Sequence, residues 1–183
     1  MHRQFVVSAF AKDWRAGNPA AVCLLDHWIS DADLQSIAAQ NNLSETAFML
    51  WPEHADECPD LVDLRWFTPT TEVDLCGHAT LASAHVLYVH CGVRGDQRLC
   101  FETRSGQLNA WQVAVSADED RLAIELPATE PIPVSRTFNW LDALGLEVMP
   151  SAVLAGEDYL LVFESEKQIV NAKPNMRLLS ELD

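Results

Sequence analysis

One segment of the chain, Ser44 to Phe48, carries an acidic residue that could transfer protons, namely Glu45. This glutamate stands between a predicted helix and an apolar run, where we expect its side chain to be partly buried. Burial raises the pKa of a carboxylic acid toward neutrality, which suits a general acid or base. The alternative is an exposed glutamate at the C-terminal end of a helix, which the helix dipole mildly disfavours.

A second segment, Asp74 to Thr80, precedes a long apolar stretch. Gly77 has no side chain, so a ligand could approach the backbone closely there. The amides of Gly77, His78 and Ala79 would then open a helix and bind an anion such as a substrate carboxylate. His78 would add a hydrogen-bond donor or carry a proton near neutral pH. The alternative is that Gly77 forms only a tight turn and His78 only a polar cap.

The turn around Asn18 is a third candidate. Its side-chain amide could line a ligand site, although an asparagine in a turn often bonds its own backbone instead. Cys76, His78 and His85 match no common zinc spacing, so we expect no metal site. The glycine-rich phosphate-binding motifs and the GxSxG motif of serine hydrolases do not occur.

These candidates need elements that position them. A helix is predicted from the N-cap Ser30 to about Asn42, with leucine, isoleucine and alanine at the 3,4 spacing of one buried face. A second helix, Gly77 to Val89, is apolar on most sides and should be buried. Residues 52–59 and 68–74 are predicted loops, and strands are predicted at 3–9, 20–25, 46–51, 61–67, 97–103, 108–116 and 121–126. A strongly curved sheet around one buried helix would satisfy this pattern.

The proline-rich stretch at 127–133 predicts a domain boundary. It separates a first domain, residues 1–126, from residues 127–183. The second part is predicted to contain helices at 138–144, 166–172 and 176–182 and one strand at 159–163.

Charge and cysteine content restrict the classes of partner. With 12 basic and 27 acidic residues, the net charge is −15, which repels nucleic acids and anionic lipids. No apolar stretch approaches the ~20 residues of a membrane span. The five cysteines are odd in number and form no CxxC pair, which predicts free thiols in a reducing cytoplasm. Cys23, Cys91 and Cys100 have apolar neighbours and are expected to be buried.

Four segments together resemble the phenazine-biosynthesis PhzF-like family, in family order and at family-like separations. They are residues 5–10 with 17–22, 44–48, 65–69 and 74–82. The resemblance implies an α+β fold like that of diaminopimelate epimerase. In such a fold, a curved, mostly antiparallel sheet or barrel wraps a central helix, and two similar halves enclose the active site.

The resemblance also implies a function. Family members are isomerases of small carboxylate-bearing molecules and need neither cofactor nor metal, and the best-known member isomerises a dihydro-hydroxyanthranilate. The glutamate matching Glu45 is their acid/base, and the Gly-His pair matching Gly77 and His78 helps to hold the substrate's carboxylate. We therefore expect a cytoplasmic isomerase that can form a homodimer, with Asn18 lining the cleft.

One departure from the family pattern leaves alternatives open. The family's second half carries an aspartate in a DPVTGSA-like segment that is not found here, so a truncated second half is expected. A first alternative is a catalytically inactive half-domain that binds a small acid or a protein partner. A second is an amino-acid racemase or epimerase that uses Cys76, which stands where related enzymes keep a thiol base.

Overall fold

The computed structural model describes residues 3–12, 16–51, 61–116, 119–134, 140–156 and 158–181. The chain divides into two compact units, Met1–Pro127 and Ala128–Asp183. No helix among the described residues is long and apolar enough to cross a membrane.

The first unit is built on one mixed sheet. Its strands follow the order β1-β2-β3-β4-β6-β7-β8, and β5 pairs with β4. Two neighbouring pairs, β2–β3 and β4–β6, are parallel, and the others are antiparallel. The strands are β1 (Arg3–Ala9), β2 (Asn18–Leu25), β3 (Glu45–Leu50), β4 (Val62–Phe67), β5 (Glu72–Val73), β6 (Leu99–Thr103), β7 (Gly106–Ser116) and β8 (Glu119–Glu125).

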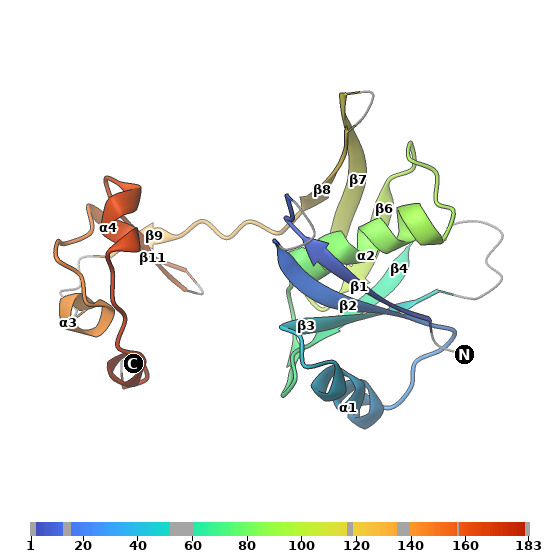
Figure 1. Ribbon diagram of the computed structural model, residues 1–183, viewed down its shortest axis with the longest axis horizontal. Coiled ribbons are helices and arrows are strands. Elements are labelled where there is room, and N and C mark those ends of the chain that lie inside the picture. Colours follow the sequence, from blue (N-terminus) through green and yellow to red (C-terminus); the bar gives the residue numbers. More distant parts are fainter. Residues whose placement is uncertain are drawn as a thin grey trace. The chain divides into compact units, whose positions relative to one another are not determined.

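The sheet curls around helix α2 (Gly77–His90), which lies along its concave face (Figure 1). Alternate side chains of the central strands, such as Val22, Ala47 and Trp66, pack with α2 into the main core. The sheet can surround much of the helix because the helix is apolar on most sides, as expected from its sequence. The predicted curved, mostly antiparallel sheet around a buried central helix is therefore confirmed.

Helix α1 (Asp31–Asn41) covers the opposite face of β2, β3 and β4. Its buried residues Leu34 and Ala38 pack against a smaller cluster that includes Phe48 and Phe67. The helix begins where predicted, because the Ser30 hydroxyl accepts a hydrogen bond from the amide of Asp33.

The second unit contains short elements. These are β9 (Ile132–Pro133), α3 (Trp140–Leu144), β10 (Ala152–Ala155), β11 (Tyr159–Val162), α4 (Glu166–Val170) and α5 (Met176–Leu179). Strands β9 and β11 both pair with β10 in an antiparallel sheet. Among the residues of this unit whose burial is described, Ala143 is the only buried hydrophobic one. The unit therefore has little core of its own.

The structure differs from the sequence-based predictions in its short strands and in the burial of two cysteines. The predicted loop at 68–74 contains the short strand β5, which pairs with the end of β4, and β9 and β10 were not predicted. Cys23 is buried as expected, but Cys91 and Cys100 are only partly buried, because an apolar neighbourhood in sequence does not fix which side of an element faces the core. The predicted loop at 52–59 lies outside the described residues.

Candidate active site

Glu45 is the first residue of β3 and belongs to the face that packs against α2. Side chains of a strand alternate between the two faces of a sheet. Ala47 and Met49 belong to the core around α2, whereas Phe48 belongs to the cluster around α1. Glu45 therefore extends the concave face of the sheet to the point where α2 begins.

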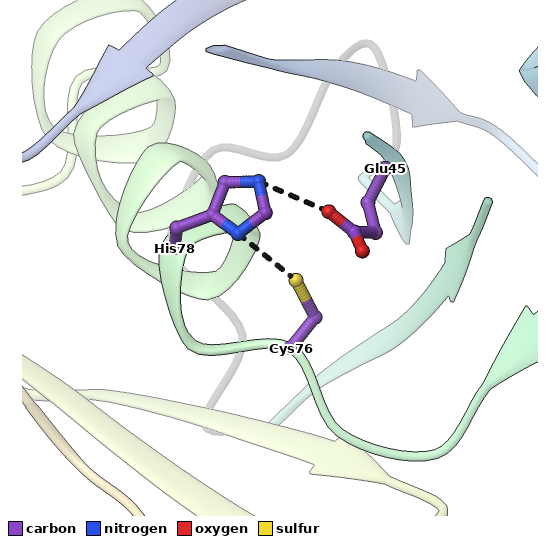
Figure 2. Close-up of side chains that lie close together, drawn as sticks. All are labelled: Glu45, Cys76 and His78. Atoms are coloured by element: carbon purple, nitrogen blue, oxygen red, sulfur yellow. Dashed lines mark hydrogen bonds and ion pairs between the residues drawn. The ribbon is translucent and has the colours of Figure 1, made fainter. Parts of the chain in front are cut away.

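The carboxylate of Glu45 is largely enclosed and contacts the ring of His78 (Figure 2). Its side chain is 20% exposed, and Oε2 lies 3.2 Å from Nε2 of His78. Despite this short distance, Oε2 is buried and accepts no hydrogen bond from any described residue, so the contact is too oblique to count as one. Buried acceptors are nearly always hydrogen-bonded in folded proteins. Glu45 thus holds an unused acceptor in a protected place.

His78 and Asn18, both predicted site residues, lie at the same place and are joined by Ser44. Nε2 of His78 lies 3.3 Å from the Ser44 hydroxyl, which donates a 3.1 Å hydrogen bond to Oδ1 of Asn18. Nδ1 of His78 lies 3.4 Å from Sγ of Cys76. The prediction did not include Ser44, although it directly precedes Glu45 in the segment that was singled out.

The first turn of α2 leaves backbone amides without an intrahelical acceptor. Hydrogen bonding in the helix starts with the amide of Thr80, which donates to the carbonyl of Cys76 at 3.2 Å. The amides of Gly77, His78 and Ala79 precede that bond and so carry the positive end of the helix dipole. Gly77 and His78 are half-buried, whereas Ala79 is fully buried.

Gly77 also lies beside the end of β8, where an added Cβ would make ordinary van der Waals contacts. A side chain at this position would point toward Ile124 and Leu126, whose nearest atoms lie 3.6 and 3.4 Å from the position of a Cβ. The space that the missing side chain leaves is therefore bordered by the end of the sheet.

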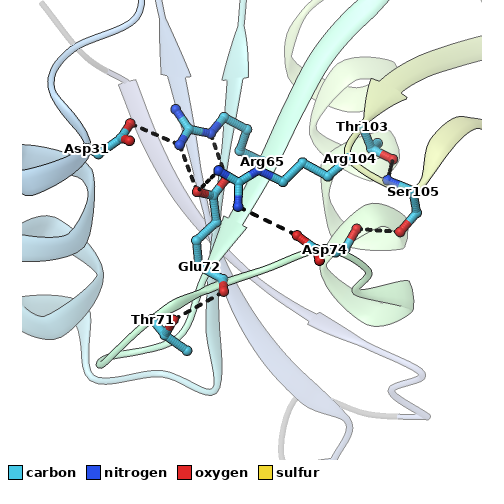
Figure 3. A network of polar contacts seen from close by, with 8 residues as sticks. All are labelled: Asp31, Arg65, Thr71, Glu72, Asp74, Thr103, Arg104 and Ser105. Carbon is cyan, nitrogen blue, oxygen red and sulfur yellow. Dashed lines mark hydrogen bonds and ion pairs between the residues drawn. The ribbon is translucent and has the colours of Figure 1, made fainter. Parts of the chain in front are cut away.

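A network of charged side chains fixes the segment that leads into α2 (Figure 3). Glu72 accepts hydrogen bonds from Nε and Nη2 of Arg65, at 2.7 and 2.8 Å, and pairs with Arg104 at 2.6 Å. Ser105 donates to the backbone carbonyl of Asp74 at 2.7 Å, and Arg104 also lies 3.5 Å from the Asp74 carboxylate. These contacts hold the chain two residues before Cys76.

The thiol of Cys76 has a strongly shifted pKa. Burial raises the pKa of Cys76 to about 12, and the nearby charge of Glu45 acts in the same direction, while the amides of Ala79 and His78 act against both. The thiol therefore keeps its proton at neutral pH. Because a thiol base must ionise to accept a proton, this environment stands against the alternative in which Cys76 is the base of a racemase.

Glu45, Cys76 and His78 each offer an atom of a type that binds metals, and these atoms lie within 4.8 Å of one another. In the observed arrangement, however, His78 turns Nδ1 toward Cys76 and Nε2 toward Glu45. One ion cannot bind both nitrogens of a single ring, so a metal bound by all three residues would use only one of these nitrogens.

A hollow of about 880 Å³ lies elsewhere in the first unit, between the end of β1, the middle of α2 and β8. Its described lining includes Phe10, His85 and Leu122 but neither Glu45 nor His78. The candidate catalytic group is therefore not in this hollow.

Comparison with sequence families gives a match over residues 7–183 to the family described as "Phenazine biosynthesis-like protein". An uncharacterized isomerase of Pseudomonas aeruginosa is 45% identical over 178 residues, which cover 97% of this chain and 63% of the relative. The human phenazine biosynthesis-like domain-containing protein is 45% identical over 125 residues, which cover 67% of this chain and 41% of the relative.

Solved structures show the same likeness. A PhzF family protein of Enterococcus faecalis superposes with a TM-score of 0.76 at 32% identity, over 98% of this chain and 64% of the other. A predicted epimerase of Pseudomonas aeruginosa shares only the fold, with a TM-score of 0.75 at 18% identity, over 100% of this chain and 67% of the other. The chain spans about 63% of the length of the uncharacterized Pseudomonas aeruginosa isomerase. It belongs to the phenazine biosynthesis-like (PhzF-like) protein family, with an epimerase-like α+β fold.

Proposed function

We propose that this family member is a cofactor-independent isomerase that moves a proton between two carbon atoms of a small carboxylate-bearing substrate, with Glu45 as the acid/base. The observation that carries the proposal is the Oε2 atom of Glu45, which is buried, unbonded and 3.2 Å from His78. An acceptor in this state gains a partner when a substrate arrives. The family membership supports the same class of reaction.

The site provides a chemical group for each step of the reaction. Glu45 removes a proton from a carbon atom next to an activating group, and the electrons left behind shift along the conjugated system. The protonated Glu45 then returns the proton to a different carbon, so that substrate and product have the same composition. The amides of Gly77, His78 and Ala79 bind the substrate carboxylate at the start of α2, and Asn18 lines the site through its contact with Ser44.

We further propose that residues 127–183 are the beginning of a second, similar domain. The apolar side chains of this unit support the proposal, because many of them are exposed and would need further partners. Cytoplasmic location and a homodimer stay predictions from the sequence and from the family resemblance.

The test is the substitution Glu45→Gln, which keeps the size of the side chain and removes its ability to carry a proton. A dihydro-hydroxyanthranilate, and then a panel of small unsaturated acids, would be incubated with the protein in D₂O and followed by proton NMR. The parent should isomerise a substrate or exchange its carbon-bound hydrogen. The variant should be slower by about 10²- to 10⁴-fold, the usual contribution of a positioned acid/base.

The matched control is Glu130→Gln, since Glu130 is an exposed glutamate of the second unit. It should leave the rate unchanged. If Glu45→Gln kept the full rate on a substrate that the parent converts, the assignment of Glu45 would be wrong. If the parent bound these acids without any exchange, the inactive binding module would be the better description.

A further inference from the structure

A chain of hydrogen-bonding groups runs past the candidate base. It begins at Cys76 before α2, passes through both nitrogens of His78, and ends at Ser44 and Asn18 (Figure 2 shows the part formed by Cys76 and His78). The successive distances are 3.4, 3.3 and 3.1 Å. The residues come from three places in the sequence, so the fold brings this series of hydrogen-bonding groups together.

The Asn18 end determines the direction in which these hydrogen bonds are donated. The Ser44 hydroxyl has two acceptors without a proton of their own, Oδ1 of Asn18 at 3.1 Å and the backbone carbonyl of Pro19 at 3.4 Å. The single proton of the hydroxyl is therefore donated to this side. The oxygen of Ser44 then turns a lone pair toward His78. The other near neighbour of Nε2, at 3.2 Å, is a carboxylate oxygen of Glu45. Both neighbours of Nε2 are therefore acceptors. A proton on Nε2 can be donated to the Ser44 oxygen, whereas the contact with Glu45 is too oblique for a hydrogen bond.

The Cys76 end favours the same direction of hydrogen-bond donation. Cys76 is 7% exposed, and burial raises the pKa of the thiol to about 12, so the S–H proton is present at neutral pH. The acceptors near the thiol are Nδ1 of His78, at 3.4 Å, and the carboxylate of Glu45, which also raises the pKa of the thiol. When the proton is donated to Nδ1, that nitrogen is the bare one of the ring. Among the described residues, Glu45 and Cys76 are the titratable groups recorded in contact with His78.

We propose that Cys76 and Ser44 together hold His78 as the neutral tautomer with its proton on Nε2. Cys76 is then a positioning residue that donates to His78, and not a base. The inference extends the proposed function, because a neutral imidazole offers an N–H beside Glu45 without carrying a proton of its own to the substrate. Glu45 remains the one group that carries the proton between carbon atoms.

The test is nitrogen NMR on the full chain labelled with ¹⁵N-histidine, at neutral pH and without substrate. The signals of His78 are those that disappear in the variant His78→Gln. Long-range couplings distinguish the two ring nitrogens, and a protonated nitrogen resonates far from a bare one. We expect Nε2 to be protonated and Nδ1 to be bare in the parent.

Two substitutions separate donation from packing. Cys76→Ser keeps a donor and should preserve the tautomer, whereas Cys76→Ala removes it and should give a mixture of tautomers. In a turnover assay, Cys76→Ala should lower kcat by about tenfold, the worth of one hydrogen bond, with little change in KM, and Cys76→Ser should restore most of the loss.

A proton on Nδ1, or on both nitrogens, in the parent would overturn the inference, and so would an unchanged tautomer in Cys76→Ala. The spectrum of the parent tests the inference even if a variant fails to fold. The NMR spectrum needs no substrate, so it tests the tautomer of His78 independently of the turnover assay. The tautomer could be wrong while Glu45→Gln still slows turnover, and the tautomer could be right while Glu45→Gln keeps the full rate.

Discussion

Oε2 of Glu45 lies 3.2 Å from Nε2 of His78 and yet accepts no hydrogen bond from any described residue. The two residues are 33 positions apart and meet because β3 and α2 both begin at this edge of the sheet. Burying an acceptor without a partner costs free energy, on the order of 1–3 kcal/mol. A cost of this kind is expected where a protein keeps a group ready for a ligand.

We therefore predict that Glu45→Gln leaves the fold as stable as the parent, or stabilises it by up to about 1 kcal/mol. The carboxamide is neutral, so its burial costs less than that of a carboxylate. Urea unfolding followed by circular dichroism would give the free energy of unfolding of both proteins. A loss of more than about 1 kcal/mol would show that Glu45 supports the fold and would weaken its assignment as a functional group.

Much of the first unit could be predicted because its elements are specified locally. Ser30 caps α1 with its own hydroxyl, and the apolar stretch from Gly77 is long enough for a buried helix. Strand β5 could not be predicted in the same way. It has two residues, and its pairing with Trp66 and Phe67 of β4 depends on contacts made by the folded chain.

The candidate site was predictable in its residue types but not in its contacts. The segments around Glu45 and His78 could be found in the sequence, since each places a polar group beside an apolar element. That Ser44 joins Asn18 to His78, and that Cys76 faces Nδ1, depends on how β2, β3 and α2 meet. Sequence spacing alone carries no information on such contacts.

Two buried thiols predict a loss of stability at alkaline pH. Burial raises the pKa of Cys23 and of Cys76 from 9.0 to about 12. Above pH 9 the unfolded chain therefore releases these protons while the folded chain retains them. The free energy of unfolding should fall between pH 9 and pH 12, by about 1.4 kcal/mol per pH unit for each thiol.

Substituting Cys23 by alanine should reduce this slope by the share of one thiol, whatever the variant does to stability at pH 7. Urea unfolding at half-unit pH intervals would measure it. Cys100→Ala is the control, because Cys100 is only partly buried. An identical alkaline slope in Cys23→Ala and the parent would contradict the prediction.

Gly17 precedes Asn18 and should tolerate no side chain. Its φ is +93°, and a Cβ would lie 2.5 Å from the backbone oxygen of Ala9, which is too close for any real contact. Gly17→Ala should therefore lower the free energy of unfolding by about 2 kcal/mol or more, through backbone strain and the displaced neighbour. Because Asn18 follows directly, turnover should fall as well.

The matched control for this variant is Gly106→Ala. Gly106 also has a positive φ, +87°, but nothing lies within 4 Å of the position of its Cβ. This variant should show only the conformational cost, about 1 kcal/mol. Equal losses in the two variants, measured by urea unfolding, would show that the approach to Ala9 is unimportant.

Glu72 should be the acidic residue on which the segment before α2 depends most. Its side chain is 11% exposed and pairs with two arginines, one of which, Arg65, is 21% exposed. Glu72→Gln removes the charge that both arginines share, leaving Arg65 with Asp31 and Arg104 with Asp74, and should cost about 1–3 kcal/mol in thermal or urea unfolding. The surface pair of Arg94 and Asp96 is the control, and Asp96→Asn should give no measurable change.

The second unit should exchange its backbone amides much faster than the first. Its exposed apolar side chains are Ile132, Val148, Met149, Tyr159, Leu160, Val162, Ile169, Val170, Met176 and Leu178. With Ala143 as its only buried hydrophobic residue among those described, this unit has little apolar contact to lose when it opens.

Hydrogen exchange followed by mass spectrometry on the full chain would measure this difference. Peptides from β10, β11 and α4 should lose protection within the shortest exchange times, while those from β2, β3 and α2 remain protected at the level of global unfolding. Protection in β10 as strong as in β2 would contradict the prediction. It would mean that the apolar side chains of the second unit are covered in solution, for example by a second copy of the chain, and a lower protein concentration should then remove that protection.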